Sequence, residues 1–103
     1  MTNHSAEEGR LTWEPYDPAW LVALVLEQCP DLPWLSHALA ACTQASVESK
    51  AYLRFVDPRN PNQPGSDWQF EENIILEDPN RGDVVLDILK GHRVGGVEFL
   101  ANL

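Results

Sequence analysis

The chain is poor in basic residues and cysteine, and it holds no long hydrophobic run. Lysine and arginine total seven against sixteen aspartate and glutamate residues in 103, so the formal net charge is −9. No basic cluster is present that could neutralise several phosphates, which disfavours direct binding to nucleic acid. No apolar run is long enough for a membrane span, and no charged segment followed by an apolar one indicates a signal peptide. We therefore expect a cytoplasmic protein without a membrane partner.

Cysteine and histidine are too few and too scattered for a disulfide framework or a metal site. Cys29 and Cys42 both lie in apolar stretches, where a thiol behaves as a small hydrophobic side chain. We expect both cysteines to be reduced and buried. The three histidines have no ligand spacing with these cysteines, so the sequence predicts no metal ion and no cofactor.

The sequence also lacks a catalytic constellation. Ser36 and His37 are adjacent on a predicted helix and point to different sides, so they cannot serve as nucleophile and base. No glycine-rich loop precedes a helix to cradle a phosphate. Gly95 and Gly96 lie inside a predicted strand, where a glycine pair is typical of a bulge or a close contact. We therefore predict no catalytic residue and no enzymatic activity.

What the chain does hold is enough apolar and aromatic material for one packed domain. Hydrophobic residues make up 44% of the chain and include four tryptophans, which is typical of a globular protein. Residues 1–10 show no hydrophobic periodicity, so we expect a disordered tail there. Residues 11–103 are then a single domain.

A first helix is predicted after Asp17. Asp17 is a good N-cap and Pro18 is a favoured first helical residue, so this helix should run to about Gln28. Its interior, residues 20–26, is apolar on nearly every side. Such a helix is buried on several faces or buries one face against another molecule. A monomer is expected, and a homodimer is the alternative if Val22 or Val25 faces outward.

A second helix is predicted to begin after Asp31. Pro33 would lie in its first turn, and apolar residues at helical spacing continue to about Gln44 or Ala45. The two predicted helices are close in sequence and would form a short hairpin.

The second half of the chain changes to the two-residue period that is typical of strands. Residues 50–56 and 68–77 both alternate between apolar and polar side chains. The segment between them, 57–66, contains three prolines and cannot be a central strand, so a long loop is predicted there. Residues 78–82 have the chemistry of a turn.

The closing segment, residues 83–100, is predicted to form a β-hairpin. Gly91 and His92 would occupy the centre of a type II′ turn. The resulting pairs are Leu89 with Val94, Leu86 with Val97, and Val84 with Phe99. A shift by one residue would mix apolar and polar side chains on both faces, so the pattern determines the register. Together the elements predict an α+β fold, in which an N-terminal two-helix hairpin packs on one face of an antiparallel β-meander of about four strands.

Glu72 interrupts the alternation of its strand. It shares a face with Trp68, Phe70, Ile74 and Leu76. Either the strand bulges at Glu71–Glu72 or extends beyond the helices, or the carboxylate points toward the core. In the last case Glu72 would lie at the rim of a cavity as a ligand or an acid–base group. A small ligand-binding domain or enzyme with Glu72 in a pocket is therefore the alternative function.

The outer face of the predicted sheet collects acidic and polar side chains. The residues expected to bind a partner there are Glu71, Asn73, Glu77, Asp87 and Glu98, with Tyr52 on the neighbouring strand if the strand order is sequential. An acidic surface of this kind suits a basic protein partner, because complementary charge steers association.

One family resemblance follows from the closing segment. The run Asp83-Val-Val-Leu-Asp-Ile-Leu-Lys-Gly-His-Arg-Val-Gly-Gly-Val-Glu-Phe-Leu100 comes after an acidic strand and two helices, and it resembles the closing hairpin of small acidic bacterial immunity proteins. These are the intracellular antidotes of contact-dependent growth inhibition and related polymorphic toxins. The resemblance implies an antitoxin that occludes the basic active site of a cognate toxin, expected to be a nuclease. It carries over no contact residue, because such families diverge most where they touch their toxins.

Overall fold

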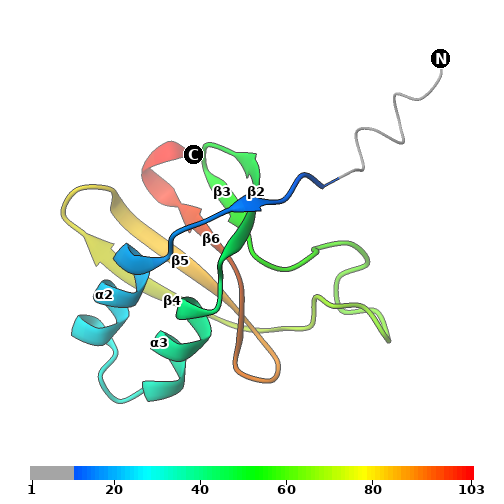
Figure 1. Cartoon of the computed structure of the whole chain (residues 1–103), viewed down its shortest axis with the longest axis horizontal. Coiled ribbons are helices and arrows are strands. Elements are labelled where there is room, and N and C mark those ends of the chain that lie inside the picture. The colour runs from blue at the N-terminus through cyan, green and yellow to red at the C-terminus, as the bar shows by residue number, and fades with distance from the viewer. Residues whose placement is uncertain (1–10) are drawn as a thin grey trace.

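The computed structural model describes residues 11–103, so the predicted tail at 1–10 lies outside the described residues. The fold is α+β, with two helices and a six-stranded antiparallel sheet (Figure 1). No helix within residues 11–103 is long and apolar enough to cross a membrane.

The chain forms a short strand, two helices and five further strands, in that order. Their bounds are β1 Glu14–Pro15, α2 Ala19–Gln28, α3 Pro33–Ala40, β2 Gln44–Ser49, β3 Tyr52–Arg54, β4 Phe70–Asp78, β5 Gly82–Leu89 and β6 Arg93–Phe99, followed by a 3₁₀ turn, η1, at Leu100–Asn102. The expectation of about four strands is wrong, because β1 and β2 add two. The predicted second helix is also too long, since residues 44–45 belong to β2 and pair with β1.

The sheet is not a sequential meander. Its strand order is β1-β2-β3-β6-β5-β4, so β3 pairs with β6 and not with β4. In this pairing Tyr52 lies opposite Glu98, and Arg54 lies opposite Gly96. A Cβ atom at Gly96 would lie 2.5 Å from the backbone oxygen of Leu53, so the close approach of these strands needs glycine there. The loop after β3 carries the chain to the far edge of the sheet, where β4 begins (Figure 1).

The hydrophobic core lies between the helices and one face of the sheet, which we call the helix face. α2 contacts β4, and α3 contacts β6. The buried core residues are Leu21, Val25, Leu35 and Leu39 of the helices, with Leu76, Val84, Leu86, Ile88, Val94 and Val97 of the strands. α2 begins close to its predicted start, where the Ala19 N–H donates to Asp17 Oδ1 at 3.0 Å. The outward-facing large apolar residue of α2 is Leu26, which is 61% exposed, and not Val25, which is buried.

The β5–β6 register follows the prediction away from the turn and departs from it near the turn. Val84 pairs with Phe99 and Leu86 with Val97 as predicted, whereas Val94 pairs with Ile88 and not with Leu89. The cause is a bulge at Gly95, which adds one residue to β6 and brings Val94 onto the helix face. The turn is also not type II′, because Gly91 and His92 both have positive φ, 85° and 56°.

Candidate functional site

The residues predicted to bind a partner divide into two groups on the face of the sheet opposite the helices, which we call the outer face. Tyr52, Asp87 and Glu98 lie on β3, β5 and β6, in the middle of the strand order. Glu71, Asn73 and Glu77 lie on β4, at the edge of the sheet. The sequential strand order that was to bring Tyr52 beside β4 is wrong, but Tyr52 and Glu98 are neighbours across β3 and β6.

Arg54 connects the central group. Its Nε donates to Glu48 Oε1 at 3.0 Å, and its Nη1 lies 3.6 Å from Oδ2 of Asp87. The guanidinium carbon also lies 4.1 Å from the ring centroid of Tyr52 and 5.2 Å from that of Trp68. Both distances are within the range of a cation–π contact. One arginine therefore contacts two of the carboxylates in this part of the sheet, those of Glu48 and Asp87.

Asp87 is buried, so the prediction that it stands exposed on the outer face is wrong. It is 7% exposed, with Arg54 beside it, and the loop before β4 crosses the neighbouring strand β6. Trp68 of that loop lies so close to β6 that a Cβ atom at Gly95 would be 2.8 Å from its ring. Burial raises the pKa of Asp87, and the charge of Glu98 adds to the increase, while Arg54 opposes it. Asp87 therefore presents little carboxylate surface to a partner.

Tyr52 and Glu98 form a hydrogen-bonded pair that links β3 to β6. The Tyr52 hydroxyl donates to Glu98 Oε1 at 3.1 Å, and both residues are half-buried. Burial raises the pKa of Tyr52, and the carboxylates of Asp87 and Glu98 raise it further against the effect of Arg54. The tyrosine is therefore a neutral donor at physiological pH, and the pair contributes to the fold as well as to the surface.

The β4 group is exposed and carries unmatched charge. Glu71, Asn73 and Glu77 are all exposed, and Ile75, on the same face between the last two, is 62% exposed. Within residues 11–103, neither Glu71 nor Glu77 has an ion-pair partner. We call the residues Glu71, Asn73, Ile75 and Glu77 the acidic edge. It is the part of the predicted site that remains available to another molecule.

Glu72 lies beside the bulge that the sequence offered as one explanation of its position. The β4–β5 register shifts between Phe70 and Glu72, so β4 does bulge. Glu72 nevertheless pairs with Ile88 of the core, so it stays on the helix face, where its side chain is exposed. It does not belong to the core, and it lines neither the hollow between α3 and the starts of β2 and β6 nor those beside residues 57–67 and 99–102. The alternative function, which needs Glu72 in a pocket, has no support in this geometry.

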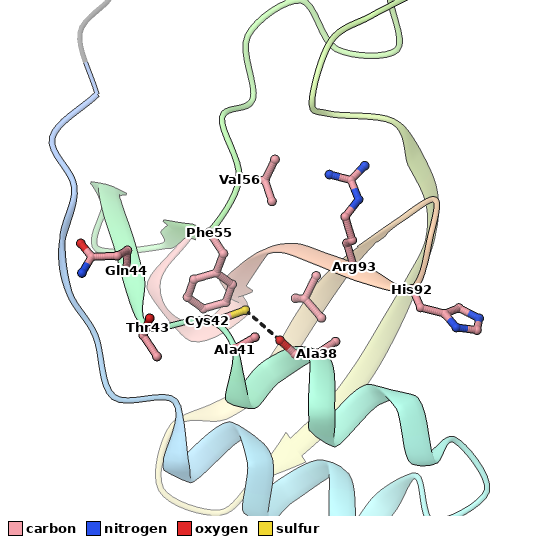
Figure 2. Close-up of a pocket in the computed structure, with 10 residues that line it drawn as sticks. Ala38, Ala41, Cys42, Thr43, Gln44, Phe55, Val56, His92 and Arg93 are labelled. Atoms are coloured by element: carbon pink, nitrogen blue, oxygen red, sulfur yellow. Dashed lines mark hydrogen bonds between the residues drawn. The ribbon is translucent and has the colours of Figure 1, made fainter.

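A hollow of about 350 Å³ opens between α3, the start of β2 and the start of β6 (Figure 2). The Cys42 thiol donates to the backbone oxygen of Ala38 at 3.3 Å, and burial raises its pKa to about 11. A thiol with this pKa stays protonated near neutral pH and is a poor nucleophile. His92 points away from Cys42 and stacks on Trp34, with ring centroids 4.3 Å apart (Figure 2). The hollow thus holds no nucleophile–base pair made of these two residues.

Both cysteines are unpaired, as predicted, but they are half-buried and not fully buried. Among the described residues, no three histidine, cysteine or acidic side chains come together in a group that could hold a metal ion.

The alternation of residues 68–77 placed Trp68 with the core side chains, whereas it lies on the outer face, beside Arg54 and Gly95. The available signal was the glycine pair in β6. Gly96 leaves room for the backbone of β3, and Gly95 leaves room for the ring of Trp68. Two glycines inside a strand thus marked the points where distant segments approach it.

In comparisons with known proteins, no family model, curated protein or solved structure matches this chain. The resemblance of the closing hairpin to immunity proteins stays a prediction.

Proposed function

We propose that the chain is a protein-binding domain that neutralises a basic partner protein by means of the acidic edge. The observation that carries this proposal is the arrangement of unmatched carboxylates around an exposed apolar side chain. Glu77 lies next to Ile75 on one face of the edge strand, and Glu71 lies at the bulge near the start of that strand. Neither carboxylate has an ion-pair partner among residues 11–103. Protein interfaces combine an apolar anchor with a polar rim in the same way.

The charge of the whole chain favours the same kind of partner. A net charge of −9 attracts cationic surfaces and repels polyanions such as nucleic acids. Charges that are exposed and unpaired contribute most to steering, because nothing nearby neutralises them. The carboxylates of the acidic edge meet both conditions, whereas Asp87 is already beside Arg54.

The specific form that we propose is an immunity protein. A nuclease toxin needs a positively charged cleft to hold the phosphate backbone of its substrate. Carboxylates of the acidic edge would compete with that backbone and block the cleft by stoichiometric binding. The resemblance of residues 83–100 to the closing hairpin of immunity proteins supports this form of the proposal.

The test is binding of the protein encoded by the neighbouring gene, first by co-purification and then by association kinetics. Glu71→Lys with Glu77→Lys should lower the association rate and abolish protection of cells that express the toxin. The matched control is Glu14→Lys with Asp31→Lys, which changes the net charge equally at exposed residues outside β4. Full protection by the folded β4 variant would show that the acidic edge is not the binding surface. Equal slowing by both variants would show that only total charge matters.

A further inference from the structure

β4 is an edge strand whose outward backbone groups are bonded at both ends and open in the middle. The Glu77 N–H donates to Oε1 of Gln28 at 2.9 Å, and Nε2 of Gln28 donates to the Glu77 carbonyl at 2.7 Å. At the other end, the Phe70 N–H donates to Oδ1 of Asn62 at 2.8 Å. Side-chain amides thus take the place of a neighbouring strand at two points of this edge.

In the middle of β4, two residues point their backbone N–H and C=O groups outward, as Glu77 does. Backbone groups alternate in direction along a strand, and β4 pairs with β5 without interruption from Glu72 to Asp78, so Asn73 and Ile75 also point their N–H and C=O groups outward. No residue from 11 to 103 bonds to these outward groups. The opposite edge of the sheet, β1, is two residues long and includes Pro15, which has no N–H to donate. β4 is therefore the edge with room for a further strand.

A second copy of this chain is a poor occupant of that edge. Each copy carries a net charge of −9. β4 itself contains Glu71, Glu72, Glu77 and Asp78, so pairing two copies would bring acidic strands together. A strand of opposite charge would gain from the same groups.

We propose that β4 takes up an extended, basic segment of the partner protein as a seventh, antiparallel strand. The backbone of that segment would bond to Ile75 and Asn73, as in other cases of strand addition to a sheet edge. An apolar side chain would lie beside Ile75, and lysine or arginine side chains on either side would reach Glu77 and Glu71. This inference rests on the proposed function and specifies the form in which the partner is recognised.

The probe is the blocked peptide Lys-Thr-Val-Thr-Thr-Thr-Lys, in which valine is meant to lie opposite Ile75. NMR titration should shift the backbone amides of Asn73 and Ile75 and slow their hydrogen exchange. In an antiparallel pair, the residue opposite Ile75 exchanges both of its backbone bonds with Ile75, whereas the next residue points its N–H away. N-methylation of the valine should therefore weaken binding at least about tenfold, as expected when backbone bonds at one residue are lost. N-methylation of the following threonine should leave binding nearly unchanged.

A variant of the protein provides a second test. Ile75→Pro removes the outward N–H without removing a bond to β5, and proline is tolerated on edge strands for that reason. The matched variant Ile75→Thr also removes the apolar side chain but keeps the N–H. Binding should be lost in Ile75→Pro and retained, though weaker, in Ile75→Thr, with circular dichroism confirming that both are folded.

The outcomes separate this inference from the proposed function. No binding of the parent peptide, or equal binding of the two N-methylated peptides, would overturn strand addition. Equal binding of those two peptides, with loss of binding when both lysines become glutamates, would overturn strand addition while leaving charge-based recognition of a basic partner intact. A third outcome is that N-methylation of the valine weakens peptide binding as expected, while the partner protein binds the Glu71→Lys and Glu77→Lys variant normally. That outcome would overturn the proposed function and leave strand addition intact.

Discussion

Nη1 of Arg54 lies 3.6 Å from Oδ2 of Asp87, and both side chains are largely shielded from water, with exposures of 14% and 11%. The arginine also bonds to Glu48 and lies over two aromatic rings, whereas the aspartate has no other ion-pair partner within residues 11–103. Asp87 therefore relies on Arg54 for its counterion, whereas Arg54 has Glu48 as a second partner.

We expect Arg54→Met to destabilise the protein far more than Asp87→Asn. Removing Arg54 leaves the buried Asp87 carboxylate without a counterion, and breaking a buried pair in this way costs about 3 to 5 kcal/mol. In Asp87→Asn, Arg54 keeps Glu48 as a partner, so the loss should be smaller. Urea denaturation at neutral pH measures both. A loss in Arg54→Met no larger than in Asp87→Asn would contradict this assignment.

The stability of the protein should depend on pH through Asp87. Its pKa is raised above 3.8 in the folded state because burial disfavours the charged form. Between 3.8 and that higher value the folded state holds a proton that the unfolded state has lost, so stability decreases as pH rises through this window and is level above it. Asp87→Asn lacks this dependence. The free energy of unfolding of Asp87→Asn minus that of the wild type should therefore increase between about pH 3 and about pH 7. Denaturation at a series of pH values measures this difference. If this difference stayed constant with pH, burial would not raise the pKa of Asp87.

Gly95→Ala should destabilise the outer face by overpacking. The new Cβ would lie 2.8 Å from two ring carbons of Trp68 and 3.0 Å from Cδ1 of Leu89. Overpacking of this kind costs about 1 to 3 kcal/mol. Replacing the ring by a smaller side chain in Trp68→Leu should relieve most of that cost. The loss of stability in the double variant should therefore be smaller than the sum of the losses in the two single variants. Additive losses would place the strain elsewhere.

The two faces of the sheet should respond differently to truncation of an aliphatic side chain. Leu86 is fully buried on the helix face, so Leu86→Ala should cost about 2 to 5 kcal/mol. Ile75 is 62% exposed on the adjacent strand, so Ile75→Ala should stay within about 0.5 kcal/mol. Chemical denaturation of both variants tests the assignment of faces. Comparable losses would contradict it.

Local signals in the sequence identified most elements of the fold. Asp17 and Pro18 marked the start of α2, and Pro33 marked the first turn of α3. The two-residue alternation identified β4, β5 and β6 and the register of β5 with β6 away from the turn. These signals depend on residues that are close together in the chain, where capping and side-chain periodicity determine the conformation.

Long-range pairing produced the differences. Gln44 and Ala45 were predicted to end the second helix, but they begin β2 and pair with Pro15 and Glu14 of β1. Tertiary pairing of this kind overrides helix propensity. The bulge at Gly95 and the burial of Asp87 both accompany the approach of Trp68 to β6. This contact joins segments that are far apart in the chain, so the local pattern of each segment does not predict it. The same cause separated the candidate site into a covered centre and an open edge.

The position of β6 has a consequence for how this domain folds. β6 lies between β3 and β5, so the two halves of the sheet are joined through it, although it is the last strand in chain order. The Tyr52–Glu98 bond connects residues 46 apart, and closing such long loops slows folding relative to local contacts. We expect β2 and β3 to remain without their central neighbour until residues 93–99 are available. Insertion of the final strand then completes the sheet and the core beneath it in one cooperative step.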